Sequence, residues 1–139
     1  MPGIQKSVRI RERVVAAIEE IAAERESDFS TVANQLLDEA TRMLRCPGIV
    51  FAYGPAGPRA RVAGTGIDVW EVIATYRSLR RNFARLRKAY PHLGEAQLRA
   101  ALNYYRLYRE EIDRQVGRNA AWTPHRIRDK YPFMAGEME

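Results

Sequence analysis

The densest run of chemically active side chains in this sequence is cationic. Six arginines and lysines fall within twelve residues, with no aspartate or glutamate between them: Arg77, Arg80, Arg81, Arg85, Arg87 and Lys88. Like charges this close repel one another unless an anion relieves the repulsion. Guanidinium and ammonium groups bind phosphates and carboxylates. The run therefore predicts a surface for phosphate groups or an acidic partner; the alternative is a solvated surface on an arginine-rich chain.

The sequence offers few residues for metal binding or catalysis. Cys46 is the only cysteine, and His92 and His125 are the only histidines, so no zinc-ligand spacing exists. His92 lies in a Tyr-Pro-His-Leu turn without convergent partners, and we interpret it as a local turn residue. A metal nuclease needs clustered acids, and those of the middle of the chain are few and scattered. We expect no enzyme activity, no metal and no cofactor.

Composition predicts a globular chain. Hydrophobic residues make up 46% and charged residues 29% of the 139 residues. No apolar run approaches the roughly 18 residues of a membrane span, and the N-terminus lacks an apolar signal-peptide core, so we expect a cytoplasmic protein without membrane contact. The net charge is +6, and the surplus lies in residues 47–116, which hold twelve Lys/Arg and six Asp/Glu.

The first forty-odd residues predict a strand followed by two helices. Val8 and Ile10 alternate with polar residues, the period of a half-buried strand. Two segments of helical period follow, separated at residues 26–28. Such a unit buries too little apolar surface to fold alone and has no disulfide or metal to help it. Pairing of two chains, strand against antiparallel strand, would solve both problems.

Residues 6–43 resemble the ribbon-helix-helix family of DNA-binding repressors and antitoxins. In that family a two-stranded ribbon enters the major groove and its outward side chains read bases. The start of the second helix clamps the DNA backbone, and Ser30 is its predicted N-cap here. One departure is Arg11-Glu12, where the family opens its first helix with Ser, Thr or Pro. The resemblance implies these DNA-binding residues: Gln5, Lys6, Ser7, Arg9, Arg11, Ser30 and Thr31.

The middle of the chain predicts a β-hairpin and three helices. Residues 49–53 and 59–63 read as strands around a Gly/Pro-rich turn. Asp68, with Glu71 three residues on, predicts a capping box that opens the first helix. A second short helix is predicted to start at Asn82, and a third to run over residues 95–113. Three helices with tight turns are typical of a helix-turn-helix core.

This middle block also resembles a family of small bacterial and archaeal domains long catalogued only as a domain of unknown function. Its members are similar to antitoxins encoded beside PIN-like ribonuclease toxins, and the resemblance implies a homeodomain-like three-helix bundle. A ribbon-helix-helix segment in front of such a domain is the arrangement of a VapB-type antitoxin. The resemblance rests on four motifs in order: Pro47-Gly48-Ile49-Val50-Phe51, Gly64-Thr65-Gly66-Ile67-Asp68-Val69-Trp70-Glu71-Val72, Tyr90-Pro91-His92-Leu93 and Leu98-Arg99-Ala100-Ala101-Leu102-Asn103-Tyr104-Tyr105.

Two interpretations of the trihelical block stay open. As a helix-turn-helix it would present Gln97 and Arg99 at the start of its third helix to bases. As a degenerate version it would serve dimerisation or partner contact, which we favour. Five aromatic residues have helical spacing, so we predict core packing rather than base stacking for them: Trp70, Tyr76, Tyr104, Tyr105 and Tyr108.

Residues 116–139 form a tail that contains several aromatics and arginines. Antitoxins commonly neutralise their toxin with a C-terminal segment, sometimes by placing an arginine in its acidic active site. We therefore predict a toxin-binding tail; the alternative is a tail packed on its own domain. The residues concerned are Trp122, Arg126, Arg128, Tyr131 and Phe133.

The sequence thus predicts a mainly α protein: a ribbon-helix-helix that forms an intertwined dimer (1–46), a β-hairpin with a helix-turn-helix-like three-helix bundle (47–115) and a tail (116–139). The expected function is that of an antitoxin of a type II toxin-antitoxin pair. It would inhibit a PIN-like ribonuclease and regulate its own operon by binding operator DNA as a homodimer or higher homo-oligomer. The alternative is a stand-alone dimeric DNA-binding regulator without a toxin.

Overall fold

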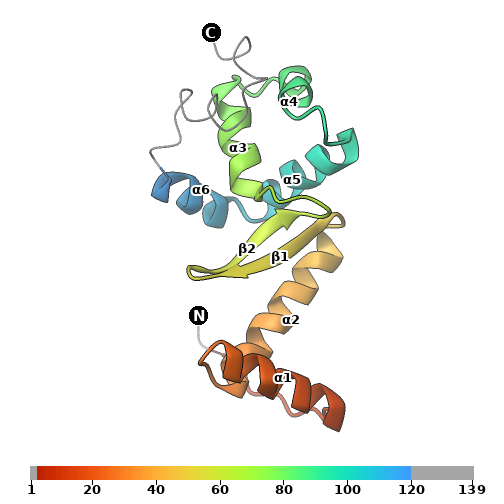
Figure 1. Ribbon diagram of the computed structural model, residues 1–139, viewed down its shortest axis with the longest axis vertical. Coiled ribbons are helices and arrows are strands. Elements are labelled where there is room, and N and C mark those ends of the chain that lie inside the picture. Colours follow the sequence, from red (N-terminus) through yellow and green to blue (C-terminus); the bar gives the residue numbers. More distant parts are fainter. Residues whose placement is uncertain (1–2, 120–139) are drawn as a thin grey trace. The chain divides into compact units, whose positions relative to one another are not determined.

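The computed structural model describes residues 3–119 (Figure 1). This part of the chain is mainly α-helical, with six helices and one two-stranded antiparallel sheet. It forms two compact units, an N-terminal unit that ends at Thr41 and a C-terminal unit that begins at Arg42. None of the helices described has the length and apolar character needed to cross a membrane.

The N-terminal unit contains α1 (Glu12–Glu24) and most of α2 (Phe29–Arg45). Its core is small: Ile18, Ala22 and Val32 are buried, with partly buried apolar neighbours around them. Residues 3–11 belong to no helix or strand and make no ladder with the rest of the described chain. The expected strand has no partner within one chain, so the two-chain ribbon stays a prediction.

The start of α2 corrects one sequence prediction. Ser30 is not the N-cap, because the helix already begins at Phe29. Asp28 takes the capping role: its Oδ1 accepts the backbone N–H of Thr31 at 2.8 Å, and its Oδ2 accepts the Thr31 hydroxyl at 3.1 Å. A carboxylate at this point also interacts favourably with the positive end of the helix dipole. Hydrogen bonds from Thr31 hold the pKa of Asp28 below its ordinary value, so the carboxylate is charged at neutral pH.

The predicted hairpin is confirmed as β1 (Ile49–Gly54) and β2 (Gly57–Val62). The register runs from Ile49 opposite Val62 to Gly54 opposite Gly57, which leaves a two-residue turn. Gly57 adopts a φ of 97°, a conformation that glycine reaches without steric cost. The inward side chains of both strands join the core of the C-terminal unit.

Four helices complete the C-terminal unit: α3 (Val69–Ser78), α4 (Phe83–Ala89), α5 (Glu95–Leu107) and α6 (Arg109–Arg118). The predicted capping box between Asp68 and Glu71 opens α3. The second of these helices, α4, starts next to Asn82, as predicted, and Asn82 caps it by accepting the backbone N–H of Arg85 at 3.0 Å. α3 and α5 pack against the hairpin (Figure 1).

The prediction of one helix over residues 95–113 is wrong, because the chain breaks between α5 and α6. Tyr108 lies at the junction with φ −127° and ψ 47°, outside the helical region. The turn directs the acids of α6 back onto α5: the hydroxyl of Tyr105 donates to Asp113 at 2.8 Å. α6 extends to Arg118, so its last residues reach into the segment expected to form the tail.

Candidate functional site

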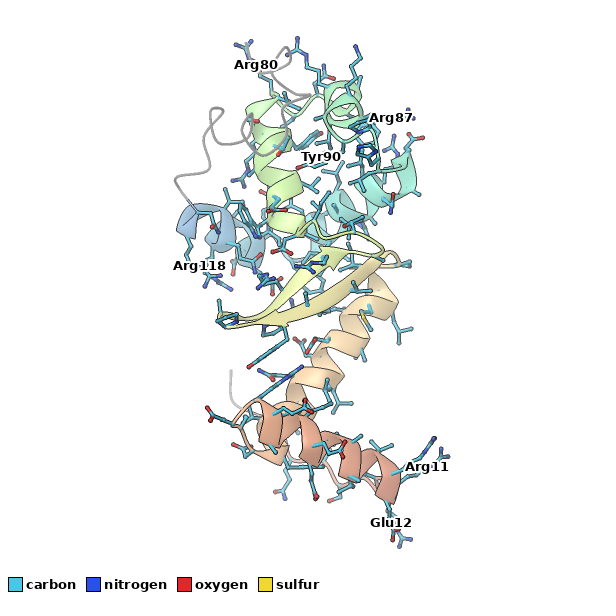
Figure 2. The ribbon with its side chains drawn as sticks, viewed as in Figure 1. Arg11, Glu12, Arg80, Arg87, Tyr90 and Arg118 are labelled. Atoms are coloured by element: carbon cyan, nitrogen blue, oxygen red, sulfur yellow. The ribbon has the colours of Figure 1, made fainter. Side chains whose placement is uncertain are left out.

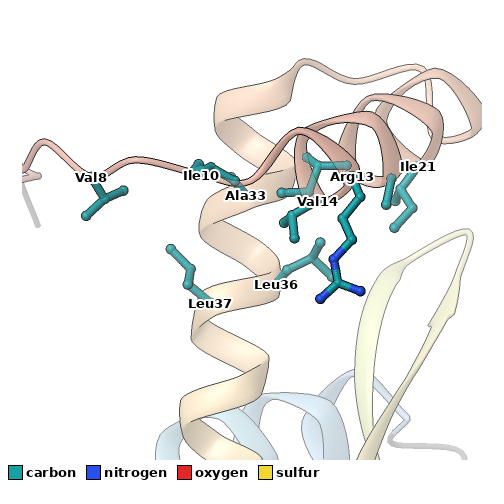
Figure 3. A pocket seen from close by; sticks show the side chains of 10 residues that line it. Val8, Ile10, Arg13, Val14, Ile21, Ala33, Leu36 and Leu37 are labelled. Carbon is teal, nitrogen blue, oxygen red and sulfur yellow. The ribbon is translucent and has the colours of Figure 1, made fainter.

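An open apolar groove of about 560 Å³ lies on the N-terminal unit (Figure 3). Val8 and Ile10 both line it, which confirms that these alternating residues share one face. Leu37 lines it from α2 and is 66% exposed, a large exposure for a leucine in an apolar groove. The groove residues are Val8, Ile10, Arg13, Val14, Ala17, Ile18, Ile21, Ala33, Leu36 and Leu37.

The polar residues of the segment 5–11 do not line the groove, and their side chains make no bond within residues 3–119. Gln5, Lys6, Ser7, Arg9 and Arg11 are all exposed, and none makes a side-chain hydrogen bond or ion pair within residues 3–119. Their donors and acceptors are therefore available to an external partner. The N-terminal segment thus combines apolar side chains that line the groove with exposed polar side chains that are open to solvent.

Ser30 and Thr31, the two predicted DNA contacts at the start of α2, differ in whether they are available to bind a phosphate. Ser30 is exposed, whereas both the backbone N–H and the hydroxyl of Thr31 already bond to Asp28. Because the Asp28 carboxylate carries a negative charge at the helix N-terminus, it opposes a phosphate at the same place. This end of α2 is a weaker anion site than the sequence predicts.

The cationic run forms an exposed surface around α4. Arg80 and Arg81 occupy the turn before α4, each with a φ of 56°, and Figure 2 shows Arg80 and Arg87 pointing outward. We name this surface the cationic turn, comprising Arg80, Arg81, Arg85, Arg87 and Lys88. All five are exposed and have no ion pair within the described chain. Arg77 is excluded, because it bonds to Tyr105 and Asp113.

The predicted readers on α5 are engaged inside the molecule. Gln97 donates to the carbonyl of Ala63 at 3.3 Å and accepts the backbone N–H of Gly94 at 2.8 Å. Arg99 pairs with Glu95 at 3.0 Å and stacks on the Phe83 ring at 4.3 Å. Base reading at this helix start would have to break these contacts, whereas the cationic turn has none to break.

A partly buried polar cluster was not predicted from the sequence. The guanidinium of Arg42 donates to the Tyr104 hydroxyl at 2.8 Å and to Glu111 at 2.5 Å, and the Tyr104 hydroxyl donates to Glu111 at 2.5 Å. Burial, and then Glu111, raise the pKa of Tyr104 above its ordinary value. Tyr104 and Tyr105 are buried as predicted, but their hydroxyls tie α5 to α6. The partners of Arg42 lie 62 and 69 residues along the chain, so no local sequence pattern predicts them.

The predicted toxin-binding residues Trp122, Arg126, Arg128, Tyr131 and Phe133 lie outside the described residues. Within residues 3–119, no group of three histidine, cysteine or acidic side chains is placed to hold a metal ion. Cys46 is buried, and its burial raises the pKa of the thiol, so it behaves as a packing residue.

Fold and surfaces together define a mainly α-helical protein: a small N-terminal unit with an open apolar groove, and a hairpin-and-helix unit with a cationic turn. Residues 50–105 match the family described as "Protein of unknown function (DUF433)". A solved DUF433 member from Anabaena variabilis ATCC 29413 is 31% identical, over 78% of this chain and 99% of that one, with a TM-score of 0.44. Residues 50–105 of this chain therefore form a DUF433 domain. Curated proteins give no match.

Proposed function

We propose that this chain is the antitoxin of a type II toxin-antitoxin pair. It acts as a dimer that binds the operator of its own gene pair and holds a PIN-like ribonuclease inactive. It catalyses no reaction. The observation that carries the proposal is the apolar groove, which adjoins an N-terminal segment whose polar side chains have no partner within residues 3–119.

The groove supports dimerisation through the N-terminal unit. Three buried residues are a small core for a unit of two helices. A second copy, with its residues 5–10 paired antiparallel to the first, would cover Val8, Ile10 and Leu37. Pairing would also satisfy backbone groups that one chain leaves without a ladder.

The same pairing supports DNA binding. When Val8 and Ile10 turn inward, the alternation of a strand turns Gln5, Ser7 and Arg9 outward on the opposite face. Two such strands fit the major groove, where glutamine and arginine make bidentate contacts with bases. Lys6 and Arg11 then lie where phosphates pass, so affinity falls as the salt concentration rises.

The C-terminal unit is the proposed holder of the nuclease. The cationic turn carries five positive charges without an ion pair in the described chain, and these complement the acidic active site of a PIN-like ribonuclease. Gln97 and Arg99 are engaged internally, which favours protein contact over base reading in this unit. The tail residues 120–139 supply the further contacts predicted from the sequence.

A gel shift on DNA upstream of the gene tests the DNA-binding part. Arg9→Ala is expected to weaken binding by about tenfold or more, since a bidentate arginine contact contributes about 1–3 kcal/mol. Arg114→Ala, which removes the same charge from an exposed position on α6, is the matched control and should bind normally. Unchanged binding by the Arg9 variant would rule out the ribbon assignment.

Co-purification with the product of the adjacent gene tests the antitoxin part. A ribonuclease that is active alone and inactive in the complex is expected. The double variant Arg85→Glu/Lys88→Glu should release the nuclease while leaving operator binding intact. If DNA binding holds and no neighbouring nuclease associates, the protein is the stand-alone regulator instead.

A further inference from the structure

A polar pocket of about 360 Å³ lies within the C-terminal unit, between the hairpin turn, the start of α3 and the end of α6. Neither the proposed DNA surface nor the cationic turn uses it. Its volume falls in the range of small-molecule sites. The side chains that matter here are Arg59, Asp68, Trp70, Gln115 and Arg118; Arg118 is marked in Figure 2.

Gln115 is the side chain that points to a ligand. It is only 9% exposed, yet its carboxamide makes no hydrogen bond within the described chain. Its backbone carbonyl, by contrast, accepts the Asn119 amide at 2.6 Å. A carboxamide offers two donors and an acceptor, and the polar atoms of this one reach solvent instead of being sealed in the interior. Since Gln115 lines the pocket, a ligand there would take these hydrogen bonds in place of water.

The charge around the pocket is positive by about two units. Arg59 donates through Nε to Asp68 at 2.8 Å, and Arg61 through Nε to the other oxygen of Asp68 at 3.2 Å. One carboxylate therefore faces two arginines, and Arg118 adds a third without an acidic partner in the described chain. A phosphate monoester carries about −1.5 to −2 at neutral pH and balances this charge, whereas a carboxylate would balance half of it.

Trp70 gives the pocket an aromatic wall. Its indole N–H donates to Asp68 at 3.2 Å, which fixes the ring beside the arginines. Aromatic rings stack on nucleobases of any sequence, and a glutamine amide can read the hydrogen-bonding edge of a base. An aromatic wall, an amide and two guanidiniums in one pocket match the chemistry of a nucleotide.

We propose that this pocket binds a nucleotide. Arg59 and Arg118 hold the phosphate, Trp70 packs against the base, and Gln115 hydrogen-bonds to the base edge. The same chemistry is present in a free mononucleotide and in one nucleotide of a single strand. The proposal does not depend on the proposed antitoxin function and involves no bond making or breaking.

Calorimetric titration of the full-length protein with AMP, and with an eight-nucleotide oligoadenylate, tests the proposal. Saturable binding of one AMP per chain is expected, with adenosine and inorganic phosphate each bound more weakly. Gln115→Met keeps the shape and removes the amide, and Arg118→Ala removes an exposed charge without disturbing the core. Each should weaken binding by about tenfold, the effect of losing one hydrogen bond to a charged or buried partner.

Arg114→Ala is the matched control, because it removes the same charge one turn earlier on α6 and lines a different surface. It should change the affinity less than about twofold. Binding of AMP identifies the free nucleotide as the source; binding of the oligonucleotide alone, with the same variant pattern, identifies a single strand. The proposal is overturned if neither probe binds, if Gln115→Met binds normally, or if Arg114→Ala weakens binding as much as Arg118→Ala.

Discussion

At the residue scale, the Tyr104 hydroxyl joins three segments of the C-terminal unit. It accepts from Arg42 and donates to Glu111, at the end of α2 and the start of α6. Tyr104→Phe leaves Arg42 and Glu111, two partly buried charged groups, each without one hydrogen-bond partner. We expect a loss of about 2 kcal/mol in the free energy of unfolding, the usual value for a hydrogen bond to a charged group, measured by urea denaturation at pH 7.

Tyr108→Phe is the control for that measurement. Tyr108 lies one helical turn along the chain from Tyr104 and packs against it with ring centroids 4.7 Å apart. Its own hydroxyl makes no hydrogen bond within residues 3–119. Its removal should change stability by less than about 0.5 kcal/mol. Equal losses in both variants would mean that the hydrogen bonds of the Tyr104 hydroxyl to Arg42 and Glu111 do not specifically stabilise this junction.

The same hydroxyl predicts a pH dependence. Burial and Glu111 raise the pKa of Tyr104 above the ordinary 10.0, so the unfolded state loses this proton first as the pH rises. The stability that Tyr104 contributes is complete below about pH 10 and is lost progressively above it. The stability gap between wild type and Tyr104→Phe should therefore stay constant up to about pH 10 and narrow above it in urea denaturation. A constant gap would contradict the raised pKa.

Residue roles set by neighbours in sequence were predictable, and those set by distant partners were not. The capping box of Asp68 and the helix start at Asn82 depend on residues within three positions, and both predictions were confirmed. The sequence predicts Ser30 as the N-cap of α2, but the helix begins one residue earlier and Asp28 accepts the capping hydrogen bond. The role of Arg42 depends on side chains 62 and 69 residues away, which no local pattern contains.

At the element scale, the glycines in and around the hairpin differ in how much a side chain would destabilise the fold. Gly57 has a φ of 97° and open space where a Cβ would lie, so only backbone strain opposes a side chain there. Gly48 combines a φ of 93° with the Ala100 Cβ, which would lie 3.0 Å from an added Cβ. We expect Gly57→Ala to lose about 1 kcal/mol of unfolding free energy and Gly48→Ala clearly more.

Gly66→Ala completes the series, since it has neither a left-handed φ nor a neighbour within 4 Å. It should be neutral or slightly stabilising, because alanine restricts the unfolded chain. Thermal denaturation of the three variants should rank them Gly48, Gly57, Gly66 from most to least destabilised. A Gly57 variant as stable as the Gly66 variant would show that the turn tolerates another conformation.

The break between α5 and α6 could not be predicted from the periodicity of apolar residues. Residues 95–113 keep an apolar face throughout and contain no glycine or proline, so the pattern predicts one helix. The chain turns at Tyr108, where Tyr104 and Tyr105 bond to Glu111 and Asp113 on the following helix. Tertiary hydrogen bonds thus override a continuous helical pattern, and such bonds are invisible before the fold is known.

At the scale of the whole molecule, α2 carries two exposed leucines that make different predictions. Leu37 is 66% exposed and lines the apolar groove, whereas Leu44 is 83% exposed and lies outside it. If a second copy covers the groove, Leu37→Glu places a charge in the dimer core. Leu44→Glu introduces the same charge on the same helix without touching that core.

Association stabilises the folded state in proportion to the logarithm of protein concentration. The wild type and Leu44→Glu should therefore sediment as dimers and show a Tm that rises with protein concentration. Leu37→Glu should sediment as a monomer, with a Tm that is lower and independent of concentration. It should also lose operator binding, because one unpaired strand presents half of the base-reading surface. A Leu37→Glu protein that remains dimeric would place the dimer interface elsewhere and leave the groove for another partner.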